Sequence, residues 1–580
     1  MSSRAYRNAP TDSTTFYPRL IGTHGAVAGN SYLSVDAAVD VLKAGGNAID
    51  AAVAACFVEG LVNPQMHTLG GECPMLLHVA GSKSGGDRVV SVNGNMAAPA
   101  RATPEEFRRR GLEHVPDEDI LAAGVPAAFG ALVTALERFG TMPLREVIAP
   151  AMALAKNGFP VSQGLVNQER YGLRDLAQKL SAWPGSRRIY FPEGVPEVGS
   201  LLKNEPLARV YDYLARAKDP QAAFYKGDIA AEIVKYSKER DGLLELSDFT
   251  SFETRLEAPE KISFGEAQIF KCGFWSQGPA MLQALAILKC FDLKKLDPGS
   301  ADYLHLLIET MKLAFADREQ YYGDPSKILV PAEVLLSEPY SKARSKLINS
   351  RQASDELRPG DAWRNAALLP ADERFTPQPW GPGTVHVDVV DAAGNMASFT
   401  PSGAWIKSAP VIEALGFPLS TRMMTFYLGP KNHPNVVAPG KRPRTTLTPS
   451  LAFRRGKPWM SFGTMGGDQQ EQWSLQFILY REAFGMTIQQ AIEAPKLSTD
   501  HFPGFFAPHD HQPKHVRIEA RFGDKAIQEL RRRGHDVEVA PDWTEGFISA
   551  AELHPDGRLE AGCDPRGSKS ETFPSFAYCW

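Results

Sequence analysis

Alternation of hydrophobic and polar residues near the middle of the chain predicts two β-strands joined by a tight turn. The first predicted strand, 384–390, reads TVHVDVV, so three valines fall on one face and three polar residues, beginning with Thr384, on the other. Residues 396–400 form the second predicted strand, and a polar, glycine-containing segment, 391–395, separates the two. The pattern indicates a hairpin with one polar face.

Apolar residues at helical spacing predict two helices near the N-terminus. Ser34 is a good N-cap for the first helix, which the Gly45–Gly46 pair ends. Asn47 begins the second helix, which is rich in alanine and ends before Pro64. The small side chains predict a tightly packed pair. A longer helix is predicted from about residue 302 to residue 317.

A polar, proline-bearing segment precedes the first predicted strand. Residues 353–383 contain five prolines and show no periodicity, which is typical of an exposed linker. The composition changes abruptly after Gly383, where the alternating strand pattern begins. The chain therefore predicts a flexible connection that ends directly at Thr384.

Composition places the protein among ordinary globular chains. Of its 580 residues, 43% are hydrophobic and 22% charged, so we expect several domains or one large layered body. The net charge of −4 gives no electrostatic reason to expect nucleic acid or a membrane surface as a partner. Six cysteines without a CxxC pair fit a reducing compartment, and residues 1–20 contain no apolar signal segment. We therefore expect a cytoplasmic protein.

The length of the predicted turn decides which residue faces Thr384. A three-residue loop, 392–394, pairs Asp391 with Asn395 and places Thr384 opposite Ser402 on the same face. A two-residue loop would instead place Thr384 opposite Gly403. In the first register two hydroxyls meet where a flexible segment ends.

This arrangement suits an N-terminal threonine nucleophile. A threonine at a new chain end carries a free α-amine that serves as the base for its own hydroxyl, so the chemistry needs no separate histidine. On local pattern alone, the alternative is that Thr384 is an ordinary β-branched strand residue.

Several motifs in chain order resemble one known family. Residues 384–395, TVHVDVVDAAGN, are similar to the nucleophile strand of the γ-glutamyltranspeptidases. The further motifs are GGNAIDAAVA (45–54), NPQ (63–65), LGG (69–71), LAFADR (313–318), GDP (323–325), KRP (441–443), GTMGG (463–467) and DPR (564–566). Together they extend over most of the chain, which is therefore identified as a divergent member of this family.

The resemblance implies an α+β fold, the four-layer αββα sandwich of the N-terminal-nucleophile hydrolases. It also implies self-cleavage of the bond between Gly383 and Thr384. The products are a large fragment, 1–383, with 353–383 as its linker, and a small fragment, 384–580, which together make one composite domain. We expect these fragments to remain associated as a heterodimer, with further dimerisation left open. No cofactor is implied.

The resemblance also assigns catalytic roles. Thr384 is the expected nucleophile of a covalent acyl-enzyme, and the backbone N–H groups of Gly466 and Gly467 are expected to hold the oxyanion. Ser402 stands where the family has a second threonine that hydrogen-bonds the nucleophile, and either hydroxyl can make that bond.

The residues that recognise a glutamyl group in the family are largely replaced. The replacements are Asn95 for the arginine that binds the α-carboxylate, Thr425 for the aspartate that binds the α-amine, Ala404 for an asparagine, and Thr445 and Thr446 for a serine pair. Losing both charged partners removes several kcal/mol of specific binding. The acyl group is therefore expected not to be γ-glutamyl.

Two arginines suggest what the site accepts instead. Arg422 and Arg444 are new cations in this part of the chain, so a carboxylated acyl amide is favoured, although both arginines are equally well explained as surface residues. The alternative is a γ-glutamyl hydrolase or transpeptidase that acts on glutathione-like compounds. The stretch 425–441 is shorter than the lid-bearing loop of many bacterial relatives, which favours hydrolysis over transfer to an amine.

Two readings of another class stay open. The HDH motif at 509–511, with His501 and His515 beside it, has the residue types of a zinc amidohydrolase site. Its proline- and phenylalanine-rich setting is typical of an irregular surface loop, so we predict no metal. The remaining alternative is an unprocessed family member that serves as a binding or scaffold protein.

Overall fold

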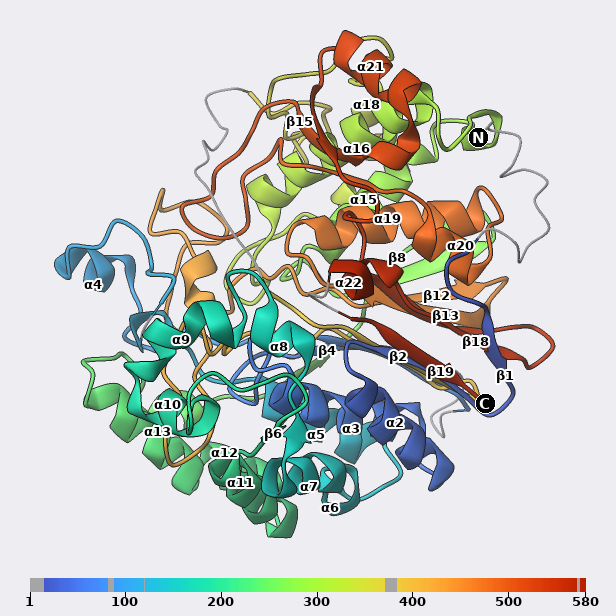
Figure 1. The fold of residues 1–580 in the computed structure, drawn as a ribbon. Helices are drawn as coiled ribbons and strands as arrows, with labels where there is room; N and C mark the ends of the chain where they lie inside the picture. The colour runs from blue at the N-terminus through green and yellow to red at the C-terminus, as the bar shows by residue number, and fades with distance from the viewer. Residues whose placement is uncertain (1–14, 82–87, 119, 371–382, 571–573) are drawn as a thin grey trace.

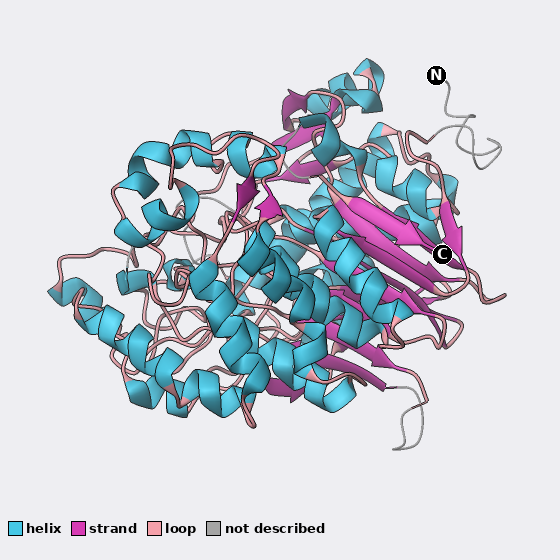
Figure 2. Ribbon diagram, turned by 60° about the horizontal axis from the view of Figure 1, so that its bottom comes forward, coloured by secondary structure: helices cyan, strands magenta, loops and turns pink. Residues whose placement is uncertain are grey.

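Two seven-stranded antiparallel β-sheets are stacked face to face at the centre of the protein (Figure 1). The computed structural model describes residues 15–81, 88–118, 120–370, 383–570 and 574–580. Helices cover the outer face of each sheet, and Figure 2 shows them on both sides of the stacked strands. The predicted α+β class and four-layer αββα sandwich are confirmed.

Strands from both halves of the chain contribute to each sheet. The first sheet has the order β1-β18-β17-β13-β12-β9-β8, with β1 (Leu20–Gly22), β8 (Glu260–Phe264), β9 (Ala267–Lys271), β12 (Ser450–Arg454), β13 (Lys457–Thr464), β17 (Ile548–Leu553) and β18 (Leu559–Gly562). The second sheet has the order β19-β2-β10-β11-β3-β4-β7, with β2 (Gly25–Gly29), β3 (Met75–Val79), β4 (Arg88–Asn93), β7 (Arg255–Glu257), β10 (Val387–Asp391), β11 (Met396–Phe399) and β19 (Phe576–Cys579).

One helical layer covers each sheet. The second sheet packs against α2 (Tyr32–Lys43), α3 (Ala48–Val62) and α5 (Ala128–Phe139). The first sheet packs against α15 (Gly278–Leu288), α19 (Gln469–Glu482) and α20 (Ile488–Glu493). Two large hydrophobic clusters fill the helix–sheet interfaces, and a smaller one fills the space between the sheets.

The other helices and short strands surround this sandwich. Their bounds are α4 (Pro104–Arg109), α6 (Leu144–Val147), α7 (Ala149–Asn157), α8 (Gln163–Asn167), α9 (Leu173–Ser181), α10 (Pro184–Tyr190), α11 (Glu205–Arg216), α12 (Pro220–Tyr225), α13 (Asp228–Lys238), α14 (Leu246–Thr250), α16 (Ala301–Tyr321), α17 (Ala332–Leu335), α18 (Glu338–Ser345), α21 (Asp524–Arg532), α22 (Pro565–Ser570), β5 (Phe159–Pro160), β6 (Leu201–Leu202), β14 (Leu497–Thr499), β15 (His515–Glu519) and β16 (Asp536–Ala540). No helix in the described ranges is both long and apolar enough to cross a membrane.

The N-terminal helices differ from the prediction at one end. Helix α2 is capped by Ser31, whose side chain accepts from the Leu33 N–H, and not by Ser34. Ser34 lies inside the helix and donates to Glu59, a buried contact that the local pattern does not reveal. Asn47 caps α3 as predicted and forms a capping box with Asp50.

The alanine-rich helix α3 supports the strand that follows the predicted nucleophile. All of its side chains are buried, and it packs against α2 and against the strands β10 and β11. Val387 and Val389 of β10 belong to the hydrophobic cluster on this helical side. The intervening polar residues therefore face the first sheet, in the interior of the sandwich.

The predicted linker is ordered and partly buried where the structure describes it. Ala362 is buried, and the Tyr321 hydroxyl donates to the Gly360 carbonyl at 2.7 Å. Asp317 also accepts from the Gly360 N–H, so the prediction of an exposed linker is wrong for this portion. Buried α16 side chains from outside the segment anchor it. Residues 371–382 of the linker lie outside the described residues.

Candidate active site

The hairpin brings Thr384 and Ser402 together. Strands β10 and β11 pair in the register of a three-residue loop, and the Asp391 N–H donates to the Asn395 carbonyl at 3.1 Å. Continued beyond the strands, this register forms an isolated bridge between Thr384 and Ser402, whose hydroxyl oxygens lie 3.2 Å apart. The register predicted from the turn is confirmed, although the regular strand begins only at Val387.

Side chains from the hairpin surround the bond that precedes Thr384. The Gly383 carbonyl accepts from the Ser402 hydroxyl at 2.5 Å and from the indole N–H of Trp405 at 3.0 Å. A Cβ on residue 383 would lie 3.1 Å from the Trp405 Nε1 atom, so glycine leaves room for this donor. The hydroxyl of Thr384 and the carbonyl of Gly383 thus share one neighbour, Ser402.

A buried polar network continues beneath the hairpin. His386 contacts Thr400 at 3.0 Å and Asp388 at 3.0 Å. Asp388 in turn accepts from the hydroxyls of Ser461 and Ser549, which belong to the first sheet. These bonds cross the space between the sheets. The polar residues of the predicted strand therefore lie in the interior of the sandwich, where they connect the two sheets beneath the site.

Arg422 approaches Ser402 from a short helical turn at 422–425. Its guanidinium donates to the Ser402 hydroxyl at 2.7 Å and pairs with Glu72 at 3.4 Å. Both side chains are fully buried. Burial lowers the pKa of Arg422 and raises that of Glu72, while their mutual attraction opposes both shifts. Within the described residues, Nη1 of Arg422 has no hydrogen-bond partner.

The predicted oxyanion residues follow β13. Gly463, at the end of that strand, lies against the ring of His386, two residues after Thr384. The carbonyls of Gly466 and Gly467 accept the first N–H bonds of α19, whereas their own N–H groups have no acceptor among the described residues. Two unpartnered N–H groups beside a helix N-terminus form a good anion site.

The predicted substrate-binding residues are buried, and several already have protein partners. Asn95 donates to the Pro443 carbonyl, and the Thr425 hydroxyl donates to the Arg422 carbonyl. Thr445 bonds the backbone of Trp275 and Leu447, whereas the buried Thr446 hydroxyl has no partner among described residues. Neither Asn95 nor Thr425 presents a charge to a ligand.

Arg444 has a different role from Arg422. It is fully buried, pairs with Glu319 at 2.7 Å and donates to the Arg318 carbonyl at 3.1 Å. Glu319 also contacts His433 and Tyr427. Arg444 is therefore held in a buried ion-pair network, although its Nε atom has no hydrogen-bond partner among the described residues.

The sequence pattern did not predict three neighbours of the site: Glu72, Trp405 and Phe506. Trp405 belongs to a small apolar cluster with Phe506, and Arg422 lies 4.7 Å from its ring centroid. Phe506 also lines a cavity of about 260 Å³ that reaches Gly467. Glu72 directly follows the LGG motif (69–71), and Trp405 lies three residues after Ser402. Their closeness in sequence to predicted residues was the only feature of the chain that indicated a place at the site.

The histidine-rich segment does not form a converging metal site. The ring of His509 stacks on Tyr427 at 3.8 Å, and His515 contacts Asp500. His501 contacts the Glu356 carbonyl. Burial lowers the pKa of His509 to about 3. These rings meet different partners, as expected of packed side chains.

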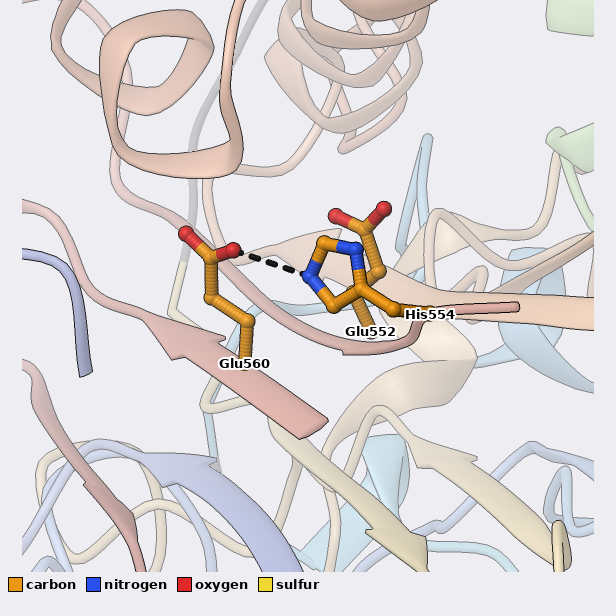
Figure 3. A group of neighbouring side chains, drawn as sticks. All are labelled: Glu552, His554 and Glu560. Atoms are coloured by element: carbon orange, nitrogen blue, oxygen red, sulfur yellow. Dashed lines mark hydrogen bonds and ion pairs between the residues drawn. The ribbon is translucent and has the colours of Figure 1, made fainter. Parts of the chain in front are cut away.

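Within the described part of the chain, one group of three acidic or histidine side chains has ligand atoms close enough to share a cation: Glu552, His554 and Glu560 (Figure 3). Its carboxylates are already engaged. Glu552 accepts from Trp459 and pairs with Arg481, and Glu560 pairs with Arg19 at 2.7 Å. The cluster is an ion-pair network on the β17–β18 hairpin.

Sequence comparison finds one family that extends over most of the chain. Residues 34–573 match the family model described as Gamma-glutamyltranspeptidase. The Escherichia coli (strain K12) protein "Glutathione hydrolase proenzyme" is 29% identical over 577 residues, covering 96% of this chain and 92% of the relative. "Acylase ACY 1 proenzyme" of Pseudomonas sp. (strain SE83) is 31% identical, covering 93% and 91%.

Solved structures show the same architecture. "Structure of LmbA2991HD" superposes with a TM-score of 0.88 at 39% identity, covering 98% of this chain and 100% of the other. "Crystal structure of cephalosporin acylase from Bacillus halodurans" superposes with a TM-score of 0.83 at 27% identity, covering 99% and 98%. The similarity therefore extends across both sheets and both helical layers.

Proposed function

Because the chain belongs to the gamma-glutamyltranspeptidase family, in which the relatives are proenzymes, we propose that it is a self-cleaving amidohydrolase with Thr384 as nucleophile. The observation that carries the proposal is the 3.2 Å contact between the hydroxyls of Thr384 and Ser402 beside the Gly383 carbonyl. Cleavage of the Gly383–Thr384 bond would give fragments 1–383 and 384–580, which remain together as a heterodimer because both sheets contain strands from each fragment.

In turnover, the free α-amine of Thr384 would accept the proton of its own hydroxyl as that oxygen attacks an amide carbonyl. The unpartnered N–H groups of Gly466 and Gly467 would then hold the oxyanion of the tetrahedral intermediate. Loss of the amine leaves an acyl-enzyme at Thr384, which water hydrolyses. The hydrogen bond between Thr384 and Ser402 would orient the nucleophile in both steps.

The proposed substrate is an amide whose acyl group carries one carboxylate and lacks an α-amine. Asn95 and Thr425, which replace the family's charged partners, are already bonded to the backbone. Arg422 donates to Ser402 through Nη2 and retains a buried Nη1 without a partner among the described residues, and the 260 Å³ cavity next to Gly467 offers space for an acyl chain. Relatives named as acylases support an acyl amide as the substrate.

The experiment that tests the proposal is denaturing electrophoresis and N-terminal sequencing of the purified protein. We expect two fragments on a denaturing gel, with N-terminal sequencing of the smaller one beginning Thr384-Val385-His386. Thr384→Ala is expected to remain a single chain and to lack amidase activity. Cleavage at the same bond in Thr384→Ala, or an intact and inactive wild-type protein, would overturn the proposal.

A further inference from the structure

Two side chains donate to the carbonyl of the bond that is proposed to break. The Gly383 oxygen accepts from the Ser402 hydroxyl at 2.5 Å and from Trp405 Nε1 at 3.0 Å. Neither donor belongs to the Gly466–Gly467 turn proposed for turnover. Two donors that converge on one carbonyl oxygen are the arrangement expected where a tetrahedral oxyanion develops.

The indole of Trp405 is held in place from several sides. Trp405 is only 1% exposed, and the Arg422 guanidinium lies 4.7 Å from its ring centroid. The ring of Phe506 packs 6.4 Å away, centroid to centroid. An indole N–H is a donor only, so this rigid ring presents a fixed hydrogen-bond donor to the Gly383 oxygen.

The hydrogen bonds of Ser402 also have a defined direction. A hydroxyl has one proton and two acceptor lone pairs. Ser402 gives its proton to Gly383 and accepts from Arg422 at 2.7 Å. The remaining contact, with Thr384 at 3.2 Å, must then be donated by Thr384. The nucleophile's proton thus points along a chain that ends on the carbonyl it would attack.

We propose that Trp405 is a catalytic residue of self-cleavage, acting with Ser402 as a processing oxyanion site separate from the Gly466–Gly467 turn; this rests on the proposed function. Thr384 Oγ1 bonds to the Gly383 carbonyl carbon while the C=O π electrons move to oxygen. That oxygen takes the proton of Ser402, and Ser402 takes the proton of Thr384. The Trp405 N–H stabilises the charge that develops during the transfer.

The later steps of self-cleavage require water as the only added reagent. Collapse of the neutral adduct breaks the carbon–nitrogen bond to Thr384, whose nitrogen takes the adduct's hydroxyl proton. An ester and a free α-amine result. Water then hydrolyses the ester, leaving a carboxylate on Gly383 and restoring the Thr384 hydroxyl. Trp405 therefore acts on the Gly383 carbonyl only during self-cleavage, while Gly383 is still bonded to Thr384.

The test follows self-cleavage of the full chain after cell-free synthesis, by quenching samples into denaturant and quantifying precursor and fragments. Trp405→Phe keeps an aromatic ring but removes the N–H, and we expect its cleavage rate to fall by about 10²–10³-fold. Trp459→Phe is the matched control, since it removes a buried indole N–H that bonds Glu552 at 2.7 Å. This control is expected to cleave at the wild-type rate.

A second measurement separates hydrogen bonding from packing. Synthesis with 5-fluorotryptophan makes the indole N–H a stronger donor, so cleavage of the wild-type sequence should accelerate. The acceleration should disappear in Trp405→Phe, whose other tryptophans are still fluorinated. Wild-type cleavage rates in Trp405→Phe, or an equal fluorine effect in that variant, would overturn the inference. Cleavage of Thr384→Ala would instead refute the proposed function itself.

Discussion

The hydroxyl oxygens of Thr384 and Ser402 lie 3.2 Å apart across the open end of a hairpin. The same serine bonds Gly383 and Arg422, so it connects the proposed nucleophile, the proposed cleavage site and a buried cation. Ser402 is therefore the residue through which a single substitution should affect both processing and turnover.

Ser402→Ala should slow amide turnover by about 10–100-fold, because it removes a hydrogen bond worth about 1.5–3 kcal/mol at a charged centre. Steady-state kinetics on fully processed enzyme would measure the loss. Ser402→Thr is the matched control, since it restores the hydroxyl and should recover most of the rate. Unchanged kinetics in processed Ser402→Ala would rule out this role.

Gly466→Ala should lower the rate of amide turnover and leave self-cleavage intact. Gly466 has a φ of +119°, and an added Cβ would lie 2.6 Å from the ring of Trp473, so the turn must shift. Losing one oxyanion donor costs about 2.7–4 kcal/mol, a fall of about 10²–10³-fold in kcat. Self-cleavage should continue, because its proposed donors are Ser402 and Trp405. A gel time course and kcat on the same preparation test both statements.

The preferred acyl group should carry a carboxylate but no ammonium. Burying a charged amine opposite Thr425 without a partner costs about 1–3 kcal/mol or more. We therefore expect kcat/KM for γ-glutamyl-p-nitroanilide to be at least about a hundredfold below that for glutaryl-p-nitroanilide on processed enzyme at neutral pH. Equal or higher activity on the γ-glutamyl compound would identify an ordinary γ-glutamyl enzyme.

The buried pair of Arg422 and Glu72 should control both stability and acyl preference. Arg422→Met alone leaves a buried, unpaired carboxylate and should destabilise the uncleaved Thr384→Ala chain by about 3–5 kcal/mol. Adding Glu72→Gln should restore much of the stability, because neither charge then remains. Chemical denaturation of the two variants measures this difference.

The same double substitution tests substrate recognition in the cleavable chain. Without Arg422, the ratio of kcat/KM for glutaryl-p-nitroanilide to that for neutral pentanoyl-p-nitroanilide should fall by about tenfold or more. An unchanged ratio in a folded, processed double variant would show that another group holds the carboxylate.

His67 should make the protein less stable in mild acid. Its Nδ1 lies 3.2 Å from the Ser402 carbonyl, and burial lowers the pKa of His67 to about 4 from an ordinary value near 6.5. Between those values the unfolded chain binds a proton that the folded chain does not. Stability should therefore be fully present above pH 6.5 and decline by up to about 1.4 kcal/mol per pH unit towards pH 4.

Denaturation of Thr384→Ala at pH 7, 6 and 5, with and without His67→Asn, isolates this contribution. Asparagine keeps an N–H donor but does not titrate, so the slope of unfolding free energy against pH should be smaller in the double variant. Equal slopes in the two proteins would contradict the assignment to His67.

The local pattern of the chain predicted the hairpin and limited its register to two alternatives. Side chains in a strand alternate with period two, so the loop length decides whether Thr384 lies opposite Ser402 or Gly403, and the structure has the three-residue loop that pairs Thr384 with Ser402. The capping box at Asn47 is likewise local, because its partner is three residues away. The family motifs predicted the αββα fold, which the structure confirms. The cytoplasmic location stays a prediction.

Only the tertiary structure decided what surrounds the proposed nucleophile. Glu72 and Arg422 are 350 positions apart, and Arg444 and Glu319 are 125 apart, so no local periodicity relates them. The fold paired each arginine with a buried carboxylate and also made Arg422 a neighbour of Ser402. It also turned the indole N–H of Trp405 towards the Gly383 carbonyl. Hydrogen-bond direction and burial depend on how distant segments pack, and the sequence pattern of a single segment does not contain that information.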